Sequence, residues 1–542
     1  MKNINSTKIL FYAVAGVFLL ISAFLHFWRI GEHPPGLHVD EGSIAFNALC
    51  IADTGKDEHG AVCPVFFKCF GDYKNPVSIY VLVPIVKVFG YSKVALRFPS
   101  AFFLILASIA VFFLSKKYCR NNWIALASAF VFSLLPWAFP ISRINICGFT
   151  VMLLCLAAGM TLLFKAISRE SYPLAMLSGL IFAISMCSTH SGRPVSAIIL
   201  ICYTLAFCFS IYKRWRPFFV FTVALFLFML PVIIYVLGNY SAITSRFNEI
   251  SVWKDNPTLV ECISMIVIRY MEYFGPAFLF VTGDPNITHS TGQAGELYLF
   301  LIPFIIAGLW TCIRYFKKNP YYRFLLGSIV TYPVAAALTI GHGHSTCCIS
   351  GSIFWLLLSA LGARLLWERR KKFMVLIIIT LILAVYEVPA YMCDYFNRYF
   401  KASRAVFSAP QMEALQKALE HLGKGETLYV SRYIFFPEII KEDFASPFHT
   451  GFIFFAGITP AEYFKAGGIP RDSICLYDGK INREGILLRL DGLLLPDESG
   501  KIFLRHDYDP SEGIPQGAVL IDKIPTPSGI CFEIYKVKGA EK

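Results

Sequence analysis

Residues 38–76 read HVDEGSIAFNALCIADTGKDEHGAVCPVFFKCFGDYKNP and lie between two strongly hydrophobic stretches of the chain. Carboxylates so close to a bilayer are costly unless water, cations or a metal ion stabilises them. This segment is therefore predicted to be a loop outside the membrane that carries a functional site. Its six carboxylates stand in a chain whose formal net charge is +13, and they are Asp40, Glu41, Asp53, Asp57, Glu58 and Asp72.

The composition of the 542 residues is typical of an integral membrane protein, because 56% are hydrophobic and only 16% are charged. Soluble proteins carry about a quarter charged residues. The positive residues form short clusters between apolar runs, which suits orientation signals and anionic lipid headgroups better than a nucleic-acid surface. We therefore expect membrane lipids, and no nucleic acid, as partners.

About eleven stretches have the length that a helix needs to cross the hydrocarbon core. The first has no small-residue cleavage site behind it, so we expect an uncleaved helix that starts in the cytoplasm. The predicted spans are 9–28, 98–115, 123–140, 148–164, 173–190, 195–211, 217–237, 297–313, 324–341, 348–366 and 373–392.

Charge predicts the orientation of these spans. Every second short connection is rich in lysine and arginine, as the positive-inside rule requires of cytoplasmic loops. The basic connections are 116–120, 165–169, 213–216, 314–323 and 364–372. This alternation places the first loop 29–97, the late loop 238–296 and the C-terminal part on the outer side of the membrane.

The outer segments have their own expected structure. Asp40 is a reasonable N-cap for a helix over residues 41–53. This helix and those expected over 77–89 and 257–274 are predicted to lie along the membrane surface. Cys50, Cys63, Cys69, Cys475 and Cys531 could form disulfides in an oxidising compartment.

From residue 395 to 542 the chain becomes more polar, with a helix expected over 410–421 and short strands in TLYVSRYIFF, SICLYD, GAVLIDKI and GICFEIYKV. This pattern predicts a small soluble α/β or α+β domain. It contains no nucleotide-binding fingerprint, so we expect no nucleotide cofactor.

Several motifs together resemble the GT-C glycosyltransferases that use polyprenyl-phosphate sugars. They are HVDEG at 38–42, TGKDEHG at 54–60, DYKNP at 72–76, LRFPS at 96–100 and GDPNITHSTGQAGELYLF at 283–300. The relatives are protein O-mannosyltransferases and the lipid A aminoarabinose transferase. The resemblance covers the membrane part, residues 1–394, and leaves 395–542 as a separate extracytoplasmic domain.

The resemblance implies an inverting transfer of a sugar from a polyprenyl (undecaprenyl) phosphate to a lipid, a cell-envelope glycan or a protein. The reaction would take place on the outer face of a bacterial cytoplasmic membrane. A transporter or flippase of lipid-linked sugars is the alternative, although no internal repeat or midspan polar cluster supports it. A sensor with an outer domain would need a cytoplasmic output module, and none is recognisable.

The resemblance also assigns roles in the first loop. Asp40 matches the acid that deprotonates the acceptor hydroxyl, and Glu41 is its neighbour; alternatively, Asp40 only caps a surface helix. Lys74 matches a lysine that contacts the lipid phosphate, although it could also reach lipid headgroups. Tyr73 stands where relatives often carry a metal-binding glutamate, with Asp72 before it, so a divalent metal ion is left open.

Further candidates for binding the phosphate or the sugar lie at the outer ends of other spans. His289 matches a histidine that reaches the phosphate or a metal in relatives, whereas the arginines could also simply anchor helix ends. In GHGHSTCC, 341–348, His342 and His344 do not share a helix face, so that pair is not expected to bind zinc. The candidates are Arg143, His190, Arg193, His289 and His344.

Overall fold

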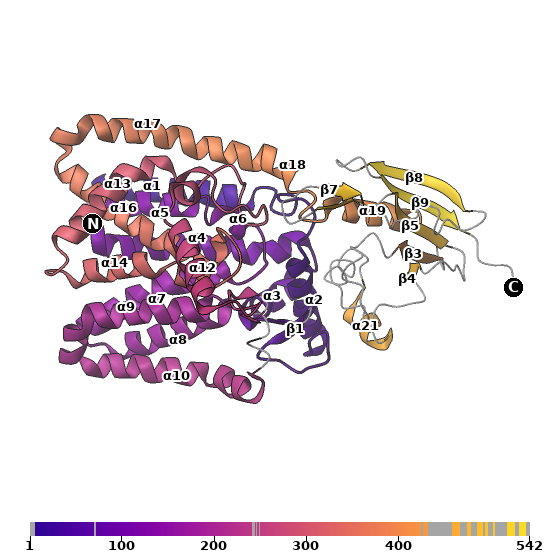
Figure 1. Ribbon diagram of the computed structural model, residues 1–542, viewed down its shortest axis with the longest axis horizontal. Coiled ribbons are helices and arrows are strands. Elements are labelled where there is room, and N and C mark those ends of the chain that lie inside the picture. Colours follow the sequence, from indigo (N-terminus) through magenta and orange to yellow (C-terminus); the bar gives the residue numbers. More distant parts are fainter. Residues whose placement is uncertain are drawn as a thin grey trace. The chain divides into compact units, whose positions relative to one another are not determined.

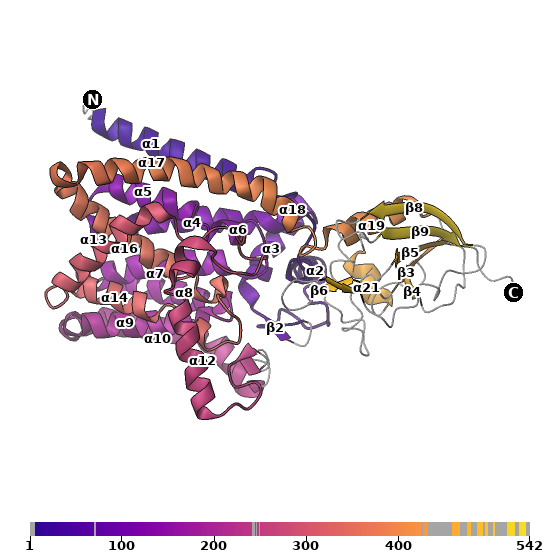
Figure 2. The same ribbon diagram turned by 45° about the horizontal axis from the view of Figure 1, so that its top comes forward.

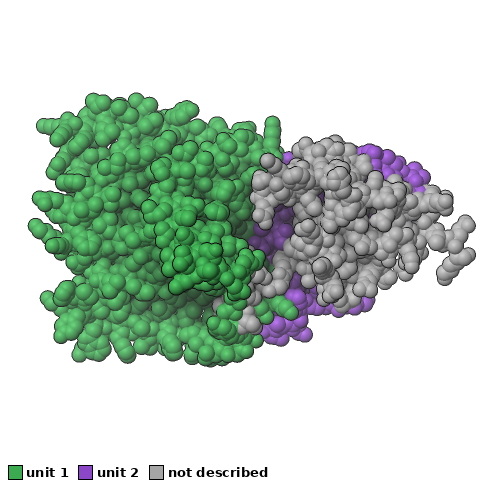
Figure 3. All heavy atoms as spheres, viewed as in Figure 1, with its two compact units in different colours: residues 1–34, 64–403 green, residues 35–63, 404–542 purple. Residues whose placement is uncertain are grey.

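The computed structural model falls into two compact units, which Figure 3 colours separately. Unit 1 contains residues 1–34 and 64–403, and unit 2 contains residues 35–63 and 404–542. The structure describes residues 6–69, 72–240, 244, 247–248, 250–423, 426–431, 458–466, 474–477, 485–491, 494–496, 502–504, 518–525 and 531–537.

Unit 1 is a helical bundle whose long helices run side by side (Figures 1 and 2). The α-helices are α1 (Ser6–Phe27), α3 (Pro76–Phe89), α4 (Lys93–Cys119), α5 (Asn122–Ser133), α6 (Phe139–Ser142), α7 (Phe149–Arg169), α8 (Tyr172–Ser188), α9 (Gly192–Lys213), α10 (Trp215–Gly238), α12 (Leu259–Glu272), α13 (Ile302–Arg314), α14 (Pro320–Thr331), α15 (Val334–Ala337), α16 (Gly351–Glu368), α17 (Arg370–Asp394) and α18 (Phe400–Ala402). Short π and 3₁₀ turns are η1 (Ala277–Val281), η2 (Leu299–Leu301), η3 (Ser345–Cys348) and η4 (Tyr395–Tyr399).

Within the described part of the chain, seven helices are long and apolar enough to cross a membrane, and four shorter helices are also apolar. Helices cover every predicted span, but the spans 123–140 and 324–341 are each interrupted near a proline, which cannot donate a backbone hydrogen bond. The helix expected at 257–274 is present as α12, followed directly by η1, and the run Leu259–Val281 has the length and composition of a candidate membrane span.

The centre and the rim of the bundle differ in burial. In the apolar window of α7, 72% of the residues are buried, against 11% for α1 and for the segment that contains α17. The rim helices therefore present apolar side chains outward, as contact with lipid requires. Between α13 and α16 the backbones approach so closely that a Cβ at Gly362 would collide with the carbonyl oxygen of Phe304, a use of glycine that is common in membrane bundles.

The segment before α3 is an antiparallel hairpin of β1 (Phe67–Cys69) and β2 (Asp72–Lys74), in which Phe67 pairs with Lys74. Pro76 starts α3 directly afterwards, and Asn75 is its N-cap residue. Proline is favoured in the first helical turn because its missing N–H is not needed there. The hairpin and the helix start thus hold Tyr73 and Lys74 in a defined strand.

Unit 2 is an α+β domain. Its five-stranded sheet has the order β4-β3-β5-β9-β8, in which β3 is parallel to β4 and β5, and β9 is antiparallel to β5 and β8. The elements are α2 (Val39–Thr54), α19 (Ala409–Glu420), α21 (Pro460–Ala466), β3 (Thr427–Ser431), β4 (Ile474–Tyr477), β5 (Gly485–Asp491), β8 (Val519–Pro525), β9 (Cys531–Val537), and the pair β6 (Leu494–Pro496) and β7 (Ile502–Leu504). This confirms the predicted α+β fold of the C-terminal part, and β5, β6 and β7 are strands that were not predicted.

Helix α2 belongs to the core of unit 2. Phe46 and Cys50 of α2 are fully buried in one cluster with Leu415 of α19 and Ile534 of β9. The predicted domain boundary kept the first loop with the membrane part, whereas the structure groups residues 35–63 with the residues after 403. The apolar residues of α2 pack against the helix and the sheet of that domain rather than along a membrane surface.

Two of the cysteines that could have formed disulfides do not do so here. Cys50 is a buried free thiol and Cys63 an exposed one. The side chains of Cys475 and Cys531 lie outside the described part of the chain.

Candidate active site in the late loop

The late loop folds through a tight turn that begins at Gly283. Its φ of +68° lies in the left-handed region, and an added Cβ would crowd the carbonyl oxygen of Ala294, so glycine is required there. The next residue, Asp284, accepts a 2.8 Å hydrogen bond from the backbone N–H of Asn286 through Oδ1. Such a side-chain-to-backbone bond two residues ahead stabilises turns.

The other carboxylate oxygen of Asp284 faces a second segment, residues 341–350. Oδ2 accepts hydrogen bonds from the backbone N–H and the hydroxyl of Ser345, both at 2.8 Å, and lies 3.3 Å from Nδ1 of His289. Burial raises the pKa of Asp284, but the hydrogen bond and charge of His289 and the charge of His344 outweigh it, so the pKa lies below its usual value. Asp284 is thus a buried, ionised carboxylate.

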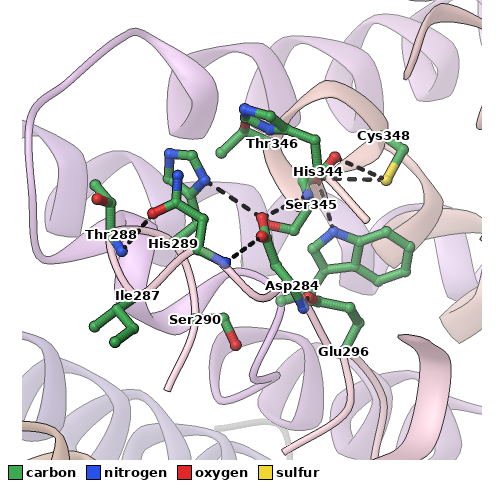
Figure 4. Close-up of polar contacts among 12 residues, drawn as sticks. Asp284, Ile287, Thr288, His289, Ser290, Glu296, His344, Ser345, Thr346 and Cys348 are labelled. Atoms are coloured by element: carbon green, nitrogen blue, oxygen red, sulfur yellow. Dashed lines mark hydrogen bonds and ion pairs between the residues drawn. The ribbon is translucent and has the colours of Figure 1, made fainter. Parts of the chain in front are cut away.

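His289 and His344 complete a cluster with Asp284. The ring centroids of the two histidines are 4.9 Å apart, and one ligand atom from each of the three residues lies within 4.8 Å of the others. Figure 4 shows the Asp284 carboxylate lying between the His289 ring and the Ser345 backbone. We call these three residues the late-loop triad.

Hydrogen bonds from the bundle hold the His344 segment in place. The His344 N–H donates to the Tyr273 hydroxyl at 3.2 Å, and the Trp137 indole N–H donates to the Ser345 carbonyl at 3.0 Å. Nδ1 of His344 lies 2.9 Å from the Thr346 hydroxyl. These contacts orient His344 in the way that outer hydrogen bonds orient metal-binding histidines.

Glu296 lies directly behind the triad. It is 1% exposed, and its Oε1 accepts the Asp284 N–H at 2.9 Å. Burial and the negative charge of Asp284 raise the pKa of Glu296 well above its usual value. Burial and the neighbouring Asp284 charge thus both favour the protonated form of Glu296, which supports Asp284 through the backbone hydrogen bond.

The late-loop triad fits a divalent metal ion. Two imidazoles and one carboxylate are a common ligand set for zinc and other first-row metals. The ligand atoms already lie within 4.8 Å of one another, and Ser345 orients the carboxylate by hydrogen bonding. Such an ion binds its ligands at about 2 Å, so the three side chains would move closer together when they hold it.

A second polar group forms where β2 leads into α3. Arg193 of α9 donates to Oδ1 of Asn75 at 2.9 Å and lies 3.5 Å from Nδ1 of His190, and its guanidinium stands 5.5 Å from the centre of the Phe66 ring. Asn75 directly follows Lys74. The structure therefore brings the predicted Arg193 and His190 to the end of the strand that carries Lys74 and Tyr73.

Arg143 has the anchoring contacts that were one of its two predicted roles. It is fully buried, and its guanidinium donates to the carbonyl oxygens of Leu25, His26, Trp28 and His33 at 2.7–3.1 Å. These bonds fix the segment that follows α1. A guanidinium with four backbone partners is not poised to bind a substrate phosphate, so we leave Arg143 out of the candidate site.

The start of α2, in unit 2, corrects the sequence interpretation. The N-cap is His38, whose Nδ1 accepts the Asp40 N–H at 3.2 Å while the Glu41 carboxylate accepts the His38 N–H at 3.0 Å. Asp40 is therefore not the cap, and its side chain remains 29% exposed. Glu41 is fully buried and serves this reciprocal capping arrangement.

Three other acids of the first loop have different outcomes. Asp57 and Glu58 are buried rather than solvated: Asp57 accepts the His59 and Ala61 N–H groups, and Glu58 bonds the Asn47 side chain. They hold the turn after α2. The side chain of Asp72, the tentative metal ligand, lies outside the described part of the chain.

His342 and His344 have different partners. His342 is exposed and lies 3.3 Å from a carboxylate oxygen of Glu272. His344 instead meets His289 and Asp284 from a distant loop, which spacing within GHGHSTCC could not reveal.

Comparison with solved structures identifies the architecture. AglB, an oligosaccharyltransferase from Archaeoglobus fulgidus solved with an inhibitory peptide and a dolichol-phosphate, superposes with a TM-score of 0.52 at 13% identity over 81% of this chain. ArnT from Cupriavidus metallidurans superposes with TM-scores of 0.51 in the apo state and 0.50 bound to undecaprenyl phosphate, at 14% and 13% identity over 89% of this chain. The chain has the GT-C fold.

The GT-C resemblance predicted from the sequence is thus confirmed at the level of the fold. The alignment covers 92–93% of the ArnT chain but only 64% of AglB, so this chain matches less than two thirds of the archaeal enzyme. No family model and no curated protein matches the sequence.

Sequence reasoning found His289 and His344 separately but missed Asp284, Glu296 and Ser345. One signal was present in GDPN at 283–286, where glycine and proline flank an aspartate in a pattern typical of a turn. Nothing local in the sequence indicates that Glu296 folds back onto that turn.

Proposed function

We propose that this protein is a multi-pass membrane glycosyltransferase that moves a sugar from a polyprenyl phosphate to an acceptor. The observation that carries the proposal is the late-loop triad, with Asp284 and His289 buried and His344 partly buried, in a chain with the GT-C fold. AglB and ArnT were solved with dolichol-phosphate and undecaprenyl phosphate, and a polyprenyl phosphate-linked sugar is the donor that we assign here. The acceptor is a lipid, a cell-envelope glycan or a protein.

The reaction needs a base and cations. The acceptor hydroxyl attacks the anomeric carbon and gives its proton to a base. On the sequence resemblance we assign that role to Asp40, which is partly exposed and is not the cap of its helix. The bond from the anomeric carbon to the phosphate oxygen breaks on the opposite face, so the configuration inverts. Lys74, Arg193 and His190 offer positive charge and hydrogen bonds to the departing phosphate.

The late-loop triad is assigned to the same phosphate. When bound there by Asp284, His289 and His344, a divalent ion would act as a Lewis acid that stabilises negative charge on the phosphate. Ser345 and Glu296 keep Asp284 in position by hydrogen bonds. Tyr73 lies next to Lys74 on β2 and is assigned to the wall of the donor site.

The predicted orientation places this chemistry and unit 2 on the outer face of a bacterial cytoplasmic membrane. The alternation of basic connections along the chain supports that orientation. Unit 2 is assigned a role in acceptor access, because the donor is held by the membrane unit.

The test is sugar transfer in membranes that contain equal amounts of each variant. Radiolabelled polyprenyl-phosphate sugars are offered with native lipid and glycan acceptors. We expect Asp40→Asn and Lys74→Gln to lower turnover by about a hundredfold or more, the range for loss of an acid–base group. Asp53→Asn is the matched control, because Asp53 is exposed at the other end of the same helix.

The outcomes separate the parts of the proposal. Full activity of Asp40→Asn would remove Asp40 from the role of base while leaving the transferase assignment intact. If wild type consumes no labelled donor but labelled lipid crosses the bilayer, the protein is a transporter and the proposal fails.

A further inference from the structure

A cavity of about 550 Å³ lies in unit 1, where α4 and α7 end and α14 begins. None of its lining residues belongs to the late-loop triad. It is lined by four cations and no carboxylate. The lining residues are Phe113, Lys116, Lys117, Tyr118, Arg120, Lys165, Asn319, Tyr321 and Tyr322. We call it the basic cavity.

Aromatic rings, rather than carboxylates, flank two of the lysines. The Lys117 ammonium nitrogen stands 4.9 Å from the centre of the Tyr321 ring, and the Lys165 nitrogen stands 5.7 Å from the Phe113 ring. Both distances fall in the range of cation–π contacts. Within the described part of the chain, none of the four cations is within 4 Å of a carboxylate oxygen.

Four uncompensated positive charges around one cavity repel one another. These cations could instead be orientation signals, but such signals need only lie in a cytoplasmic loop. That role does not explain why cations from two helices and a helix terminus line the basic cavity. Tyr118 adds a second observation: it lines the cavity, it is 2% exposed, and its hydroxyl has no hydrogen-bond partner in the described chain. A buried hydroxyl without a partner is costly.

The position of the basic cavity indicates the source of the anion. Its walls are the ends of α4 and α7, which are long and apolar enough to span a membrane, so the cavity lies where lipid headgroups lie. Phe113 is 50% exposed, about one turn further into the helix than the cations. Basic pockets at the cytoplasmic ends of membrane helices bind anionic headgroups, and an exposed aromatic side chain beside them suits an acyl chain.

We propose that the basic cavity binds the phosphate headgroup of an anionic membrane lipid on the predicted cytoplasmic side. The lysines and Arg120 pair with the phosphate oxygens, and Phe113 contacts the first acyl methylenes. This site is distinct from the donor site, and the proposal does not depend on the transferase activity.

The experiment is lipid binding by native mass spectrometry on the full chain, purified in a delipidating detergent. The probes are phosphatidylglycerol, phosphatidylcholine with the same acyl chains, and soluble glycerol phosphate. We expect wild type to retain phosphatidylglycerol selectively. The double variant Lys117→Gln/Lys165→Gln is expected to lose about tenfold or more in affinity for it, since each lysine near an anionic lipid contributes several-fold.

The matched control is Lys371→Gln/Lys372→Gln, which removes the same charge from exposed lysines of another basic connection. Equal losses in both double variants would mean that overall charge, not the cavity, binds the lipid, and would overturn the proposal. Equal retention of phosphatidylglycerol and phosphatidylcholine by wild type would do the same. Binding of glycerol phosphate as tight as that of the lipid would assign the cavity to a soluble phosphate ester instead.

Tyr118→Phe provides a second test that does not change the charge. We expect this variant to be more stable than wild type without lipid, because it removes a buried hydroxyl that makes no bond in the protein and is therefore costly. The stabilisation that phosphatidylglycerol gives should be smaller than in wild type. Undiminished lipid stabilisation in this variant would show that the Tyr118 hydroxyl does not contact the lipid and would overturn the proposed site.

Discussion

Arg143 and Arg193 of unit 1 allow two roles of an arginine, anchoring the backbone and binding the substrate, to be tested separately. Arg143 donates four hydrogen bonds of 2.7–3.1 Å to the backbone carbonyl oxygens of residues 25, 26, 28 and 33. In Arg143→Gln, at most two of these acceptors can be satisfied by the shorter amide, because it has only two N–H donors. At least two carbonyls are then left without a partner inside the protein.

The magnitude follows from those contacts. Each unsatisfied buried acceptor costs about 1–3 kcal/mol, so the loss of two or more should lower the unfolding free energy of Arg143→Gln by about 2 kcal/mol or more. Arg193→Gln makes the same chemical change where the arginine contacts the side chain of Asn75 and the His190 ring. It should keep its stability to within about 1 kcal/mol and lose donor binding instead.

The assay is thermal unfolding of both purified variants in detergent, followed by tryptophan fluorescence, together with the donor dependence of sugar transfer. We expect a lower unfolding temperature for Arg143→Gln only, and a higher KM for the donor with Arg193→Gln only. A stable Arg143→Gln that has lost donor affinity would refute the assignment of Arg143 to anchoring.

Three other predictions concern the triad and the core of unit 2. His344→Ala should bind at least tenfold less metal than wild type, as measured by elemental analysis. His342→Ala should bind as much as wild type, because its side chain lies outside the triad. Equal metal content in the two variants would contradict the triad as a ligand set. The pKa of Glu296 is higher in the folded than in the unfolded protein, so wild type loses stability as the pH rises above the pKa of the unfolded state. Glu296→Gln lacks this loss and should become more stable relative to wild type as the pH is raised from about 5 to about 8, as measured by thermal unfolding. A stability difference that does not change with pH would argue for an ionised glutamate. Phe46→Ala removes a fully buried ring from the unit 2 core and should lower the stability of that unit by about 3–5 kcal/mol, seen as faster proteolysis of the C-terminal part; unchanged proteolysis would contradict the shared core.

The fold was largely predictable because its signals are local. Long apolar stretches require helices, and the alternation of basic loops follows from the charge of single residues. The interruptions of α5–α6 and α14–α15 were also local in origin, since Pro136 and Pro333 stand at them. What the apolar pattern could not distinguish was a surface helix from a possible span at Leu259–Val281.

The candidate site was predictable only in part because it is assembled from distant segments. His289 and His344 are far apart in the chain, and their 4.9 Å separation depends on the Asp284 bridge to Ser345. The role of Arg143 could not be predicted either, because the sequence around a cation at a helix end is the same whether that cation binds phosphate or backbone carbonyls. The capping role of His38 was hidden for a similar reason, since aspartate is the commoner cap.

Helix α2 also sets an order of events during synthesis. Residues 35–63 leave the ribosome early, but the partners of Phe46 in α19 and β9 come after residue 403. The apolar face of α2 must therefore wait until all membrane helices have been made before its own domain can close around it. A chain that stops before residue 404 lacks the partners that bury Phe46 and Cys50, so the apolar core of unit 2 can form only after the last helix of unit 1 has been synthesised.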